Sequence, residues 1–443
     1  MKNRRSVAQL GIPPLLLGCL LCGILNAADS TPDDEANWQK LETRPFVLQD
    51  TKQVLSPGMF DRELWHVFSI PKDNSGVDLG LPHAGKDAAG KDRPRLMVRL
   101  FQKDYIWIDL NGDGKPSADE CRRINSDGYT DSFFLDLYYS DGTSSQYSFR
   151  FRTMIEEQKF SLLCATARIA EFEGQKIVLL DDNGNGKYND LNGDAIIIGH
   201  CPVSFLGKYI LINDKIYELL VHEAGSVIEL RLAPKIEWGW IDMFDKYKPP
   251  QKNETLKIHT IIASGPLGSF AFDEKHKKLR VPAGAYDIVF GLFERAKEWA
   301  YLKKGEKTSF TVATGKVASP KWGGKVEAAF DVDSDGDEVT VQSPNFFGEG
   351  SEQYFPDNYR ATVPSAGIAQ VYTDTMRVQQ VNPFNSRRFE MTPEGGLKSL
   401  IFNHFRNCDD DYLITVNYSS GIIGRIETSV KFRFIRKRPE KKS

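Results

Sequence analysis

The chain has 443 residues, and its 57 basic and 60 acidic side chains leave a formal net charge of −3. This near-balance argues against a dedicated nucleic-acid-binding protein, which would carry a basic excess. The hydrophobic fraction of 41% and the charged fraction of 26% exclude wholesale disorder and a collagen-like repeat. The 36 glycines, 27 phenylalanines and 16 tyrosines favour a turn-rich β protein, and the length allows two or three domains.

The N-terminal segment has the three parts of a secretory signal peptide. Residues 2–5 are rich in lysine and arginine, residues 10–25 are apolar and uncharged, and small residues follow at Ala27 and Ala28. We therefore predict a signal peptide over 1–28 and an exported protein, periplasmic, at the cell surface or secreted. The apolar run is short for a transmembrane helix and contains two prolines, so we expect no membrane span in the mature chain.

Six cysteines are present, and two of them lie in the predicted signal peptide. Because Leu16-Leu17-Gly18-Cys19 resembles a lipobox, a lipid anchor at Cys19 stays open. The mature chain contains no CxxC pair, so neither a zinc site nor a dithiol motif is expected. If Cys121 is oxidised, its partner should be Cys164 or Cys201, and free thiols are the alternative. The four cysteines of the mature chain are Cys121, Cys164, Cys201 and Cys408.

The rest of the chain shows the two-residue alternation of β-strands and little helical periodicity. Residues 96–100, 147–151 and 227–232 alternate between apolar and polar side chains. The predicted fold is therefore mainly β, with two or three antiparallel β-sandwich-like domains in tandem. We expect a polar tether over 29–44, a β domain over 45–235, a linker over 236–252, a small β domain over 253–320, an Ig-like β-sandwich over 321–435 and a basic tail over 436–443.

Residues 109–120 match the twelve-residue EF-hand calcium loop. Ca²⁺ takes six to eight oxygen ligands, which such a loop supplies from positions 1, 3, 5, 7 and 12 around a glycine at position 6. The preceding residues 104–108 look like a strand, so we predict an EF-hand-like loop between strands. A solvated turn without metal is the alternative. The expected ligands are Asp109, Asn111, Asp113, the carbonyl of Lys115 and Glu120.

A second loop of the same kind follows the apolar residues 176–180, about 72 residues later (181 − 109). This repetition hints at an internal duplication. Position 12 holds Asn192 instead of a glutamate, so closure is expected from Asp190 or Asp194. Because position 12 carries no carboxylate, we expect the second loop to bind calcium more weakly than the first. The expected ligands are Asp181, Asn183, Asn185, the carbonyl of Lys187, Asp190 and Asp194.

A third acidic run, residues 331–337, has three aspartates at the same spacing. It lies between two strand-like segments, and Gln342 stands at position 12. A β-hairpin turn accounts for this run without a metal ion, and we favour that interpretation.

The strand–loop–strand modules, the second ending in Asp194-Ala195-Ile196-Ile197-Ile198-Gly199, resemble repeats in large uncharacterised exported multi-domain proteins of planctomycete-like bacteria. Residues 282–286 also resemble a turn of small β-sandwich modules of the carboxypeptidase-regulatory kind. Together the two resemblances cover about half of the chain. They imply β modules and export, and they carry over no activity.

Local enzyme signatures are missing from the sequence. It contains no GxSxG elbow, no HExxH, no P-loop and no GxGxxG after a strand, and its seven histidines lack metal-ligand spacing. We therefore expect an exported calcium-binding protein with a non-enzymatic surface, matrix or binding role, whose partner is a cell-envelope or polysaccharide surface. The alternative is a secreted carbohydrate-active or other hydrolytic enzyme with dispersed catalytic residues, because paired carboxylates leave no local mark.

Overall fold

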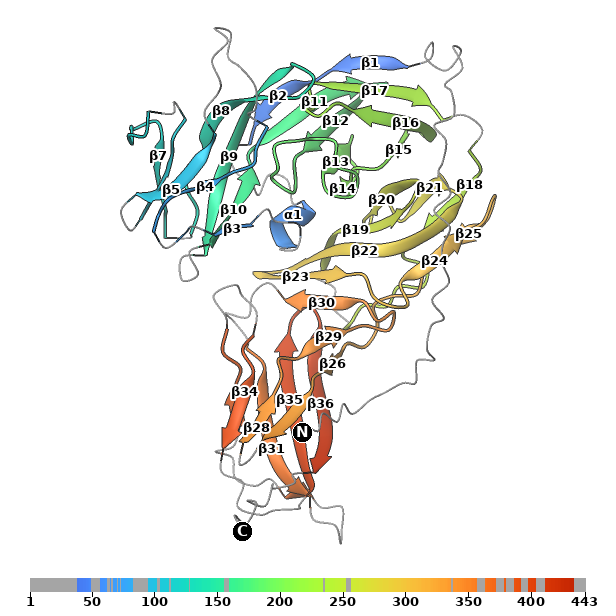
Figure 1. Ribbon diagram of the computed structural model, residues 1–443. Coiled ribbons are helices and arrows are strands. Elements are labelled where there is room, and N and C mark those ends of the chain that lie inside the picture. The colour runs from blue at the N-terminus through green and yellow to red at the C-terminus, as the bar shows by residue number, and fades with distance from the viewer. Residues whose placement is uncertain are drawn as a thin grey trace, which may run out of the picture.

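The computed structural model is built almost entirely of antiparallel β-strands (Figure 1), so the predicted mainly-β fold is confirmed. In the described residues no helix is long and apolar enough to cross a membrane. The predicted signal peptide, the basic tail, Asn111 and Cys408 lie outside those residues. The structure describes residues 38–48, 56–61, 64, 67–69, 71, 73–82, 95–101, 104–110, 113–126, 128–154, 159–233, 236–251, 256–335, 338–356, 363–371, 378–379, 386–391, 397–403 and 411–433.

The upper sheets, formed by β1 to β17, share one hydrophobic core. The alternation at 147–151 buries Tyr147, Phe149 and Phe151 completely on one side of β9. The four sheets have the strand orders β1 (Gln39–Glu42), β17 (Val227–Leu232), β16 (Lys215–Val221), β15 (Tyr209–Ile212); β14 (Ser204–Phe205), β13 (Ala195–Ile198), β12 (Gln175–Leu180), β11 (Thr166–Phe172), β2 (Arg44–Val47); β3 (Val67–Ser69), β10 (Lys159–Cys164), β9 (Ser144–Met154), β8 (Phe133–Tyr138); and β4 (Val77–Asp78), β5 (Met97–Phe101), β6 (Tyr105–Ile108), β7 (Cys121–Arg123).

The central sheet lies next in the chain and surrounds a second core that includes the buried Trp322. A short three-stranded sheet packs beside it, and its β18–β25 pair is parallel. The central sheet has the order β20 (Gly268–Phe272), β19 (Lys257–Gly265), β22 (Gly284–Arg295), β23 (Glu298–Lys303), β30 (Gln353–Pro356), β29 (Asn345–Phe347), β26 (Glu327–Ala329), with β24 (Ser309–Val312) on β22; the short sheet has β21 (Lys278–Pro282), β18 (Trp238–Asp242), β25 (Val317–Ala318).

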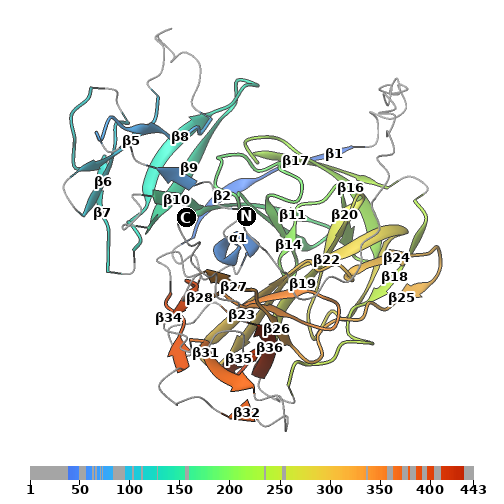
Figure 2. The ribbon, with the colours of Figure 1, turned by 60° about the horizontal axis from the view of Figure 1, so that its bottom comes forward.

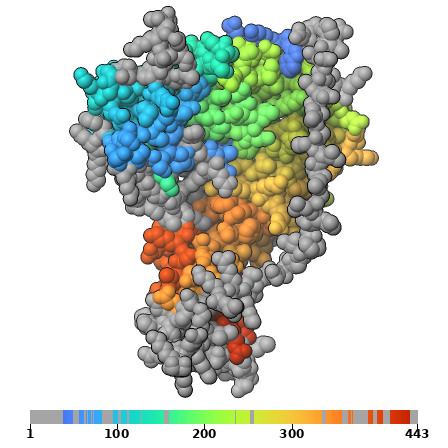
Figure 3. Space-filling model, viewed as in Figure 1, coloured from blue at the N-terminus to red at the C-terminus, as the bar shows by residue number. Residues whose placement is uncertain are grey.

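The lower sheets complete the described chain and project below the central sheet (Figure 1; Figure 3). They have a core of their own, which includes Val339, Ile414 and Val416. Their strand orders are β27 (Val332–Asp335), β28 (Glu338–Val341), β34 (Leu400–Asn403); and β32 (Val378–Gln379), β31 (Ser365–Val371), β35 (Asp411–Ser420), β36 (Gly424–Arg433), with β33 (Ser386–Arg388) on β31.

Three features of the predicted domain map differ from the observed sheets. The end of the predicted tether forms β1, which pairs with β17. The predicted linker over 236–252 contains β18 and the fully buried Ile241 and Met243, so part of it belongs to a core. The boundary at 320 divides the strands of the central sheet, because β23 pairs with β30. Sheet pairing joins segments that are distant in sequence, and local composition carries no signal of it.

Helix α1 (Pro57–Phe60) lies between the upper sheets and the central sheet (Figure 1; Figure 2). A small apolar cluster joins the two groups of strands at this place. Phe205 of β14 packs there with Phe290 and Leu292 of β22, and Phe60 of α1 packs against the same cluster. The upper and central sheets therefore share a contact surface.

Cys121, Cys164 and Cys201 are free thiols, so the conditional pairing of Cys121 with either of the others does not form. Burial raises the pKa of the Cys164 thiol to about 12, whereas Cys121 is much less desolvated. The thiolate is the reactive form. In the folded protein at pH 8, we expect Cys121 to be alkylated at least about tenfold faster than Cys164. Mass mapping after timed iodoacetamide treatment measures both rates, and equal rates would contradict the burial of Cys164.

Candidate metal centre

The first EF-hand-like loop connects two neighbouring antiparallel strands of the upper sheets. Strand β6 enters it and β7 leaves it, with Trp107 opposite Cys121. The strand expected before the loop is present, and a strand in place of a helix also follows it. The loop is thus the end of a β-hairpin, and Asn111 lies outside the described residues.

Glu120, at position 12, folds back into this loop. Its side chain is 2% exposed. The Leu110 backbone N–H donates to Oε1 at 2.9 Å, and the Ser117 N–H donates to Oε2 at 3.2 Å. These bonds hold the carboxylate inside a loop whose residues 113–119 are otherwise exposed. This is the placement that a closing ligand needs.

Asp109, at position 1, has one carboxylate oxygen without a hydrogen-bond partner in the part of the chain that the structure describes. The Gly114 N–H donates to its Oδ2 at 3.1 Å. Within the described structure, Oδ1 is buried and accepts no hydrogen bond. A buried polar atom without a partner costs about 1–3 kcal/mol, more if charged, and calls for an explanation such as an ion. Gly114 has a φ of +71°, which glycine adopts without strain, and position 6 requires that turn.

The second loop is likewise a hairpin end, between β12 and β13, with Leu180 opposite Ala195. Its first residue, Asp181, is 2% exposed. Each of its two carboxylate oxygens accepts two hydrogen bonds. Their donors are the Gly184 N–H at 2.8 Å and the Asn185 N–H at 3.1 Å on Oδ1, and the Gly186 N–H at 2.7 Å and the Tyr147 hydroxyl at 2.5 Å on Oδ2.

Asn183, Asn185 and Asp190 are brought together in this loop. The side-chain amides of Asn183 and Asn185 donate to Asp190 Oδ2 at 3.0 and 2.5 Å. The Lys187 N–H donates to Asn185 Oδ1 at 2.8 Å, as the Lys115 N–H donates to Asp113 Oδ1 at 2.7 Å in the first loop. The two loops therefore share their local backbone turns.

Asp194 occupies in the second loop the place that Glu120 occupies in the first. Each carboxylate immediately precedes the return strand, and Asp194 is 1% exposed. The Asp182 N–H donates to Asp194 Oδ1 at 3.3 Å, just as the N–H of Leu110 donates to Glu120. Asp194 Oδ2 accepts from the Asp190 N–H at 2.8 Å. Of the two residues left open by the sequence, Asp194 is the structural counterpart of Glu120.

No family model matches the chain, and no curated protein matches it. A solved structure of a DUF3823 family protein from Bacteroides uniformis covers 46% of this chain and 100% of that chain, at 9% sequence identity and a TM-score of 0.16. A TM-score this low supports no statement about fold or function. The resemblance to exported planctomycete-like proteins stays a prediction.

The second loop buries carboxylates, and keeping them ionised without a cation costs free energy. Burial raises the pKa of Asp181 and of Asp194, and the charge of Asp181 raises that of Asp194 further. Desolvation also raises the pKa of Asp182 to about 6. Bringing a divalent cation near these groups would offset that cost. Among the described residues, no three His, Cys, Asp or Glu side chains are placed to hold a metal, so an ion would need the amide and carbonyl oxygens of an EF-hand-like loop as well.

The third acidic run forms the hairpin that the sequence favoured. Strands β27 and β28 pair with Asp335 opposite Glu338, and Gln342 Nε2 donates to Asp333 Oδ2 at 3.3 Å. Asp333 and Asp335 lie along a strand and do not surround a loop. The two-residue spacing of these aspartates is therefore that of side chains on one face of a strand.

Two supporting residues had no local signal in the sequence. Tyr147 lies 34 residues before the Asp181 that it contacts, and only the pairing of distant strands brings them together. Asn192 stands at position 12 when the loop is numbered from Asp181, but its side chain points out of the loop. Its Oδ1 accepts hydrogen bonds from the Ser264 and Ser269 hydroxyls.

Proposed function

We propose that this protein is an exported calcium-binding β protein with a non-enzymatic surface, matrix or binding role. The observation that supports calcium most is the first loop, where the buried Oδ1 of Asp109 has no hydrogen-bond partner among the described residues while Glu120 is held inside the same hairpin. A hard cation with oxygen ligands satisfies both features.

In this proposal the first loop would hold Ca²⁺ through Asp109, Asn111, Asp113, the Lys115 carbonyl and Glu120. The exposure of residues 113–119 leaves the site open to solvent, which suits exchange with an external calcium pool. Extracellular modules of this kind bind with dissociation constants of about 10⁻⁴–10⁻³ M. The second loop would use Asp181, Asn183, Asn185, the Lys187 carbonyl, Asp190 and Asp194.

Export rests on the signal-peptide pattern of residues 1–28, with a lipid anchor at Cys19 as a variant of the same route. In an external compartment, calcium in two hairpin loops would stiffen the upper sheets. A stiffened set of sheets suits attachment to a cell-envelope or polysaccharide surface. The resemblance to exported multi-domain proteins supports this role and names no reaction.

Calcium stoichiometry tests the proposal. We expect the wild-type chain to bind two calcium ions in isothermal titration and native mass spectrometry, and Glu120→Gln to lose one. Asp119→Asn is the matched control, since it removes one charge from an exposed neighbour in the same loop. It should keep both ions. Absence of bound calcium from the wild-type chain at millimolar concentration would overturn the proposal.

A further inference from the structure

Two side chains of the second loop point away from the proposed ion position and reach other elements. Asp182, at position 2, accepts hydrogen bonds from the Ser56 hydroxyl and from the Gly58 N–H, the latter at 2.7 Å. A Cβ at Gly58 would lie 2.2 Å from the Asp182 carbonyl oxygen. Helix α1 therefore packs against the loop at a distance that only glycine allows.

Helix α1 continues this connection to the central sheet. Phe60 stacks on Trp299 of β23 with ring centroids 5.6 Å apart. Asp61 forms an ion pair with Lys303 at the end of the same strand, at 2.6 Å. The second loop is thus linked to β23 through one short helix, which Figure 1 shows between them.

Asn192 makes a second, direct connection. Its Oδ1 accepts from the Ser264 hydroxyl of β19 at 2.8 Å. The Ser269 hydroxyl of β20 shares its one proton between Ser264 Oγ at 2.7 Å and Asn192 Oδ1 at 3.2 Å. A Cβ at Gly207 would lie 2.7 Å from the Ser269 nitrogen. The loop therefore reaches the central sheet directly through Asn192 and indirectly through α1, and Gly207, which follows β14, brings the upper sheets close to the same strand β20.

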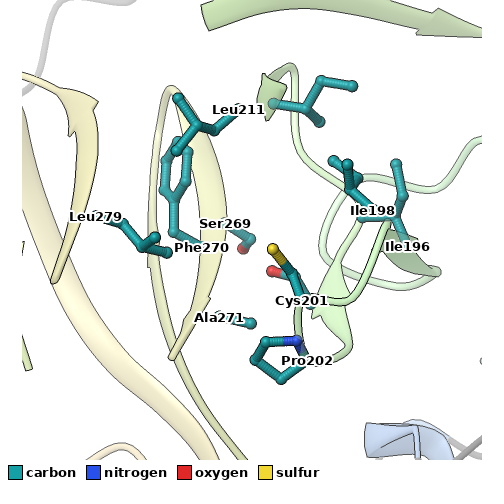
Figure 4. A pocket seen from close by; sticks show the side chains of 11 residues that line it. Ile196, Ile198, Cys201, Pro202, Leu211, Ser269, Phe270, Ala271 and Leu279 are labelled. Atoms are coloured by element: carbon teal, nitrogen blue, oxygen red, sulfur yellow. The ribbon is translucent and has the colours of Figure 1, made fainter. Parts of the chain in front are cut away.

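The apolar side chains beside these contacts leave a small space between the two groups of sheets. A cavity of about 50 Å³ lies between the upper and central sheets, lined by Ile198, Cys201, Ser269 and Phe270 among others (Figure 4). Ligand pockets are commonly about 300–1,000 Å³, so this space is too small for one.

We propose that ion binding in the second loop clamps the upper sheets to the central sheet. The clamp rests on the proposed calcium function and adds a role for this one site. Asp182 follows the proposed ligand Asp181, and Asn192 lies two residues before the proposed ligand Asp194, so occupancy would further restrict both side chains to the directions that they already have. By linkage, docking must raise calcium affinity by the factor by which calcium favours docking. The described residues of the first loop offer no such position, since β7, which follows the loop, and β22 lie in different parts of the molecule in both ribbon views (Figure 1; Figure 2).

Hydrogen exchange of the full chain, with and without calcium, tests the clamp. In the wild type we expect calcium to slow exchange in the first loop, in residues 56–61 and in β19–β20. Glu120→Gln should lose the slowing only in the first loop. Ser264→Ala with Ser269→Ala should lose it at β19–β20 and weaken calcium binding by the second loop about fivefold or more. Thr415→Ala with Ser429→Ala, which removes a hydroxyl pair in the lower sheets, should change neither.

A second variant tests the contact between α1 and the second loop. Gly58→Ala displaces the helix without altering a proposed ligand, and it should weaken calcium binding by the second loop in the same way. If calcium protects both loops but leaves β19–β20 and residues 56–61 unchanged, the clamp is wrong and calcium binding stands. If calcium protects no segment, the calcium function itself is wrong.

Discussion

Calcium at about 1 mM should raise the melting temperature of the upper sheets by about 3–6 °C for each occupied loop, relative to EDTA. With a dissociation constant near 10⁻⁴ M, binding to the folded state alone stabilises it by RT ln 11, about 1.4 kcal/mol. For a unit of about 190 residues this free energy corresponds to such a shift. Differential scanning fluorimetry in the two buffers measures it.

Glu120→Gln should remove most of the first loop's share, because it takes away the bidentate carboxylate and one negative charge. The amide oxygen of glutamine can keep the hydrogen bond from the Leu110 N–H, and the N–H of the exposed Ser117 can bond water instead, so the EDTA melting curve should change little. Asp119→Asn should melt as the wild type does in both buffers. Identical wild-type curves in calcium and EDTA would mean that the loops are turns without metal.

The sequence predicted the hairpin setting of both loops for a sound physical reason. Strand alternation and the DxNxDG spacing are local, and each fixes a few consecutive backbone turns. The Lys115 and Lys187 N–H bonds follow from that local spacing. The placement of Glu120 follows as well, because twelve residues is the length at which the loop closes.

The twelve-residue numbering of the EF-hand does not fit the second loop, because this loop is longer than the first. Its return strand begins at Ala195, so two additional residues place Asp194, and not position 12, immediately before that strand. Asn192 was doubted as a ligand from the sequence, and the structure shows its bonds to Ser264 and Ser269. These partners lie 72 and 77 residues away. No local pattern encodes such contacts, and the same reason explains the strands found inside the predicted tether and linker.

The two loops also differ in how far they are preformed, and this difference predicts the largest effects of substitution. Asp181 accepts four hydrogen bonds, three from loop N–H groups and one from Tyr147, and all but the one from Asn185 are buried. In its described contacts Asp109 accepts one, from Gly114, and its other oxygen has no partner. The second loop is therefore held largely by its own hydrogen bonds, whereas the described contacts of the first leave one oxygen of Asp109 open to the proposed ion.

Asp181→Ala should consequently lower the free energy of unfolding by about 4 kcal/mol even in EDTA, because it leaves several buried donors without an acceptor. Asp109→Ala should cost at most about 1 kcal/mol in EDTA, since Gly114 is exposed and water can replace the lost acceptor. In 1 mM calcium Asp109→Ala should additionally lose the roughly 1.4 kcal/mol of the first site. Urea unfolding in the two buffers gives all four values.

Tyr147→Phe is a less disruptive substitution, which tests the same hydrogen bonds if Asp181→Ala does not fold. It removes one of the four donors and should cost about 1–2 kcal/mol in calcium and EDTA alike. Equal losses for Asp109→Ala and Asp181→Ala in EDTA would contradict the contrast between the loops. A loss for Tyr147→Phe that appears only in calcium would show that the hydroxyl acts through the ion, and that the second loop is not preformed.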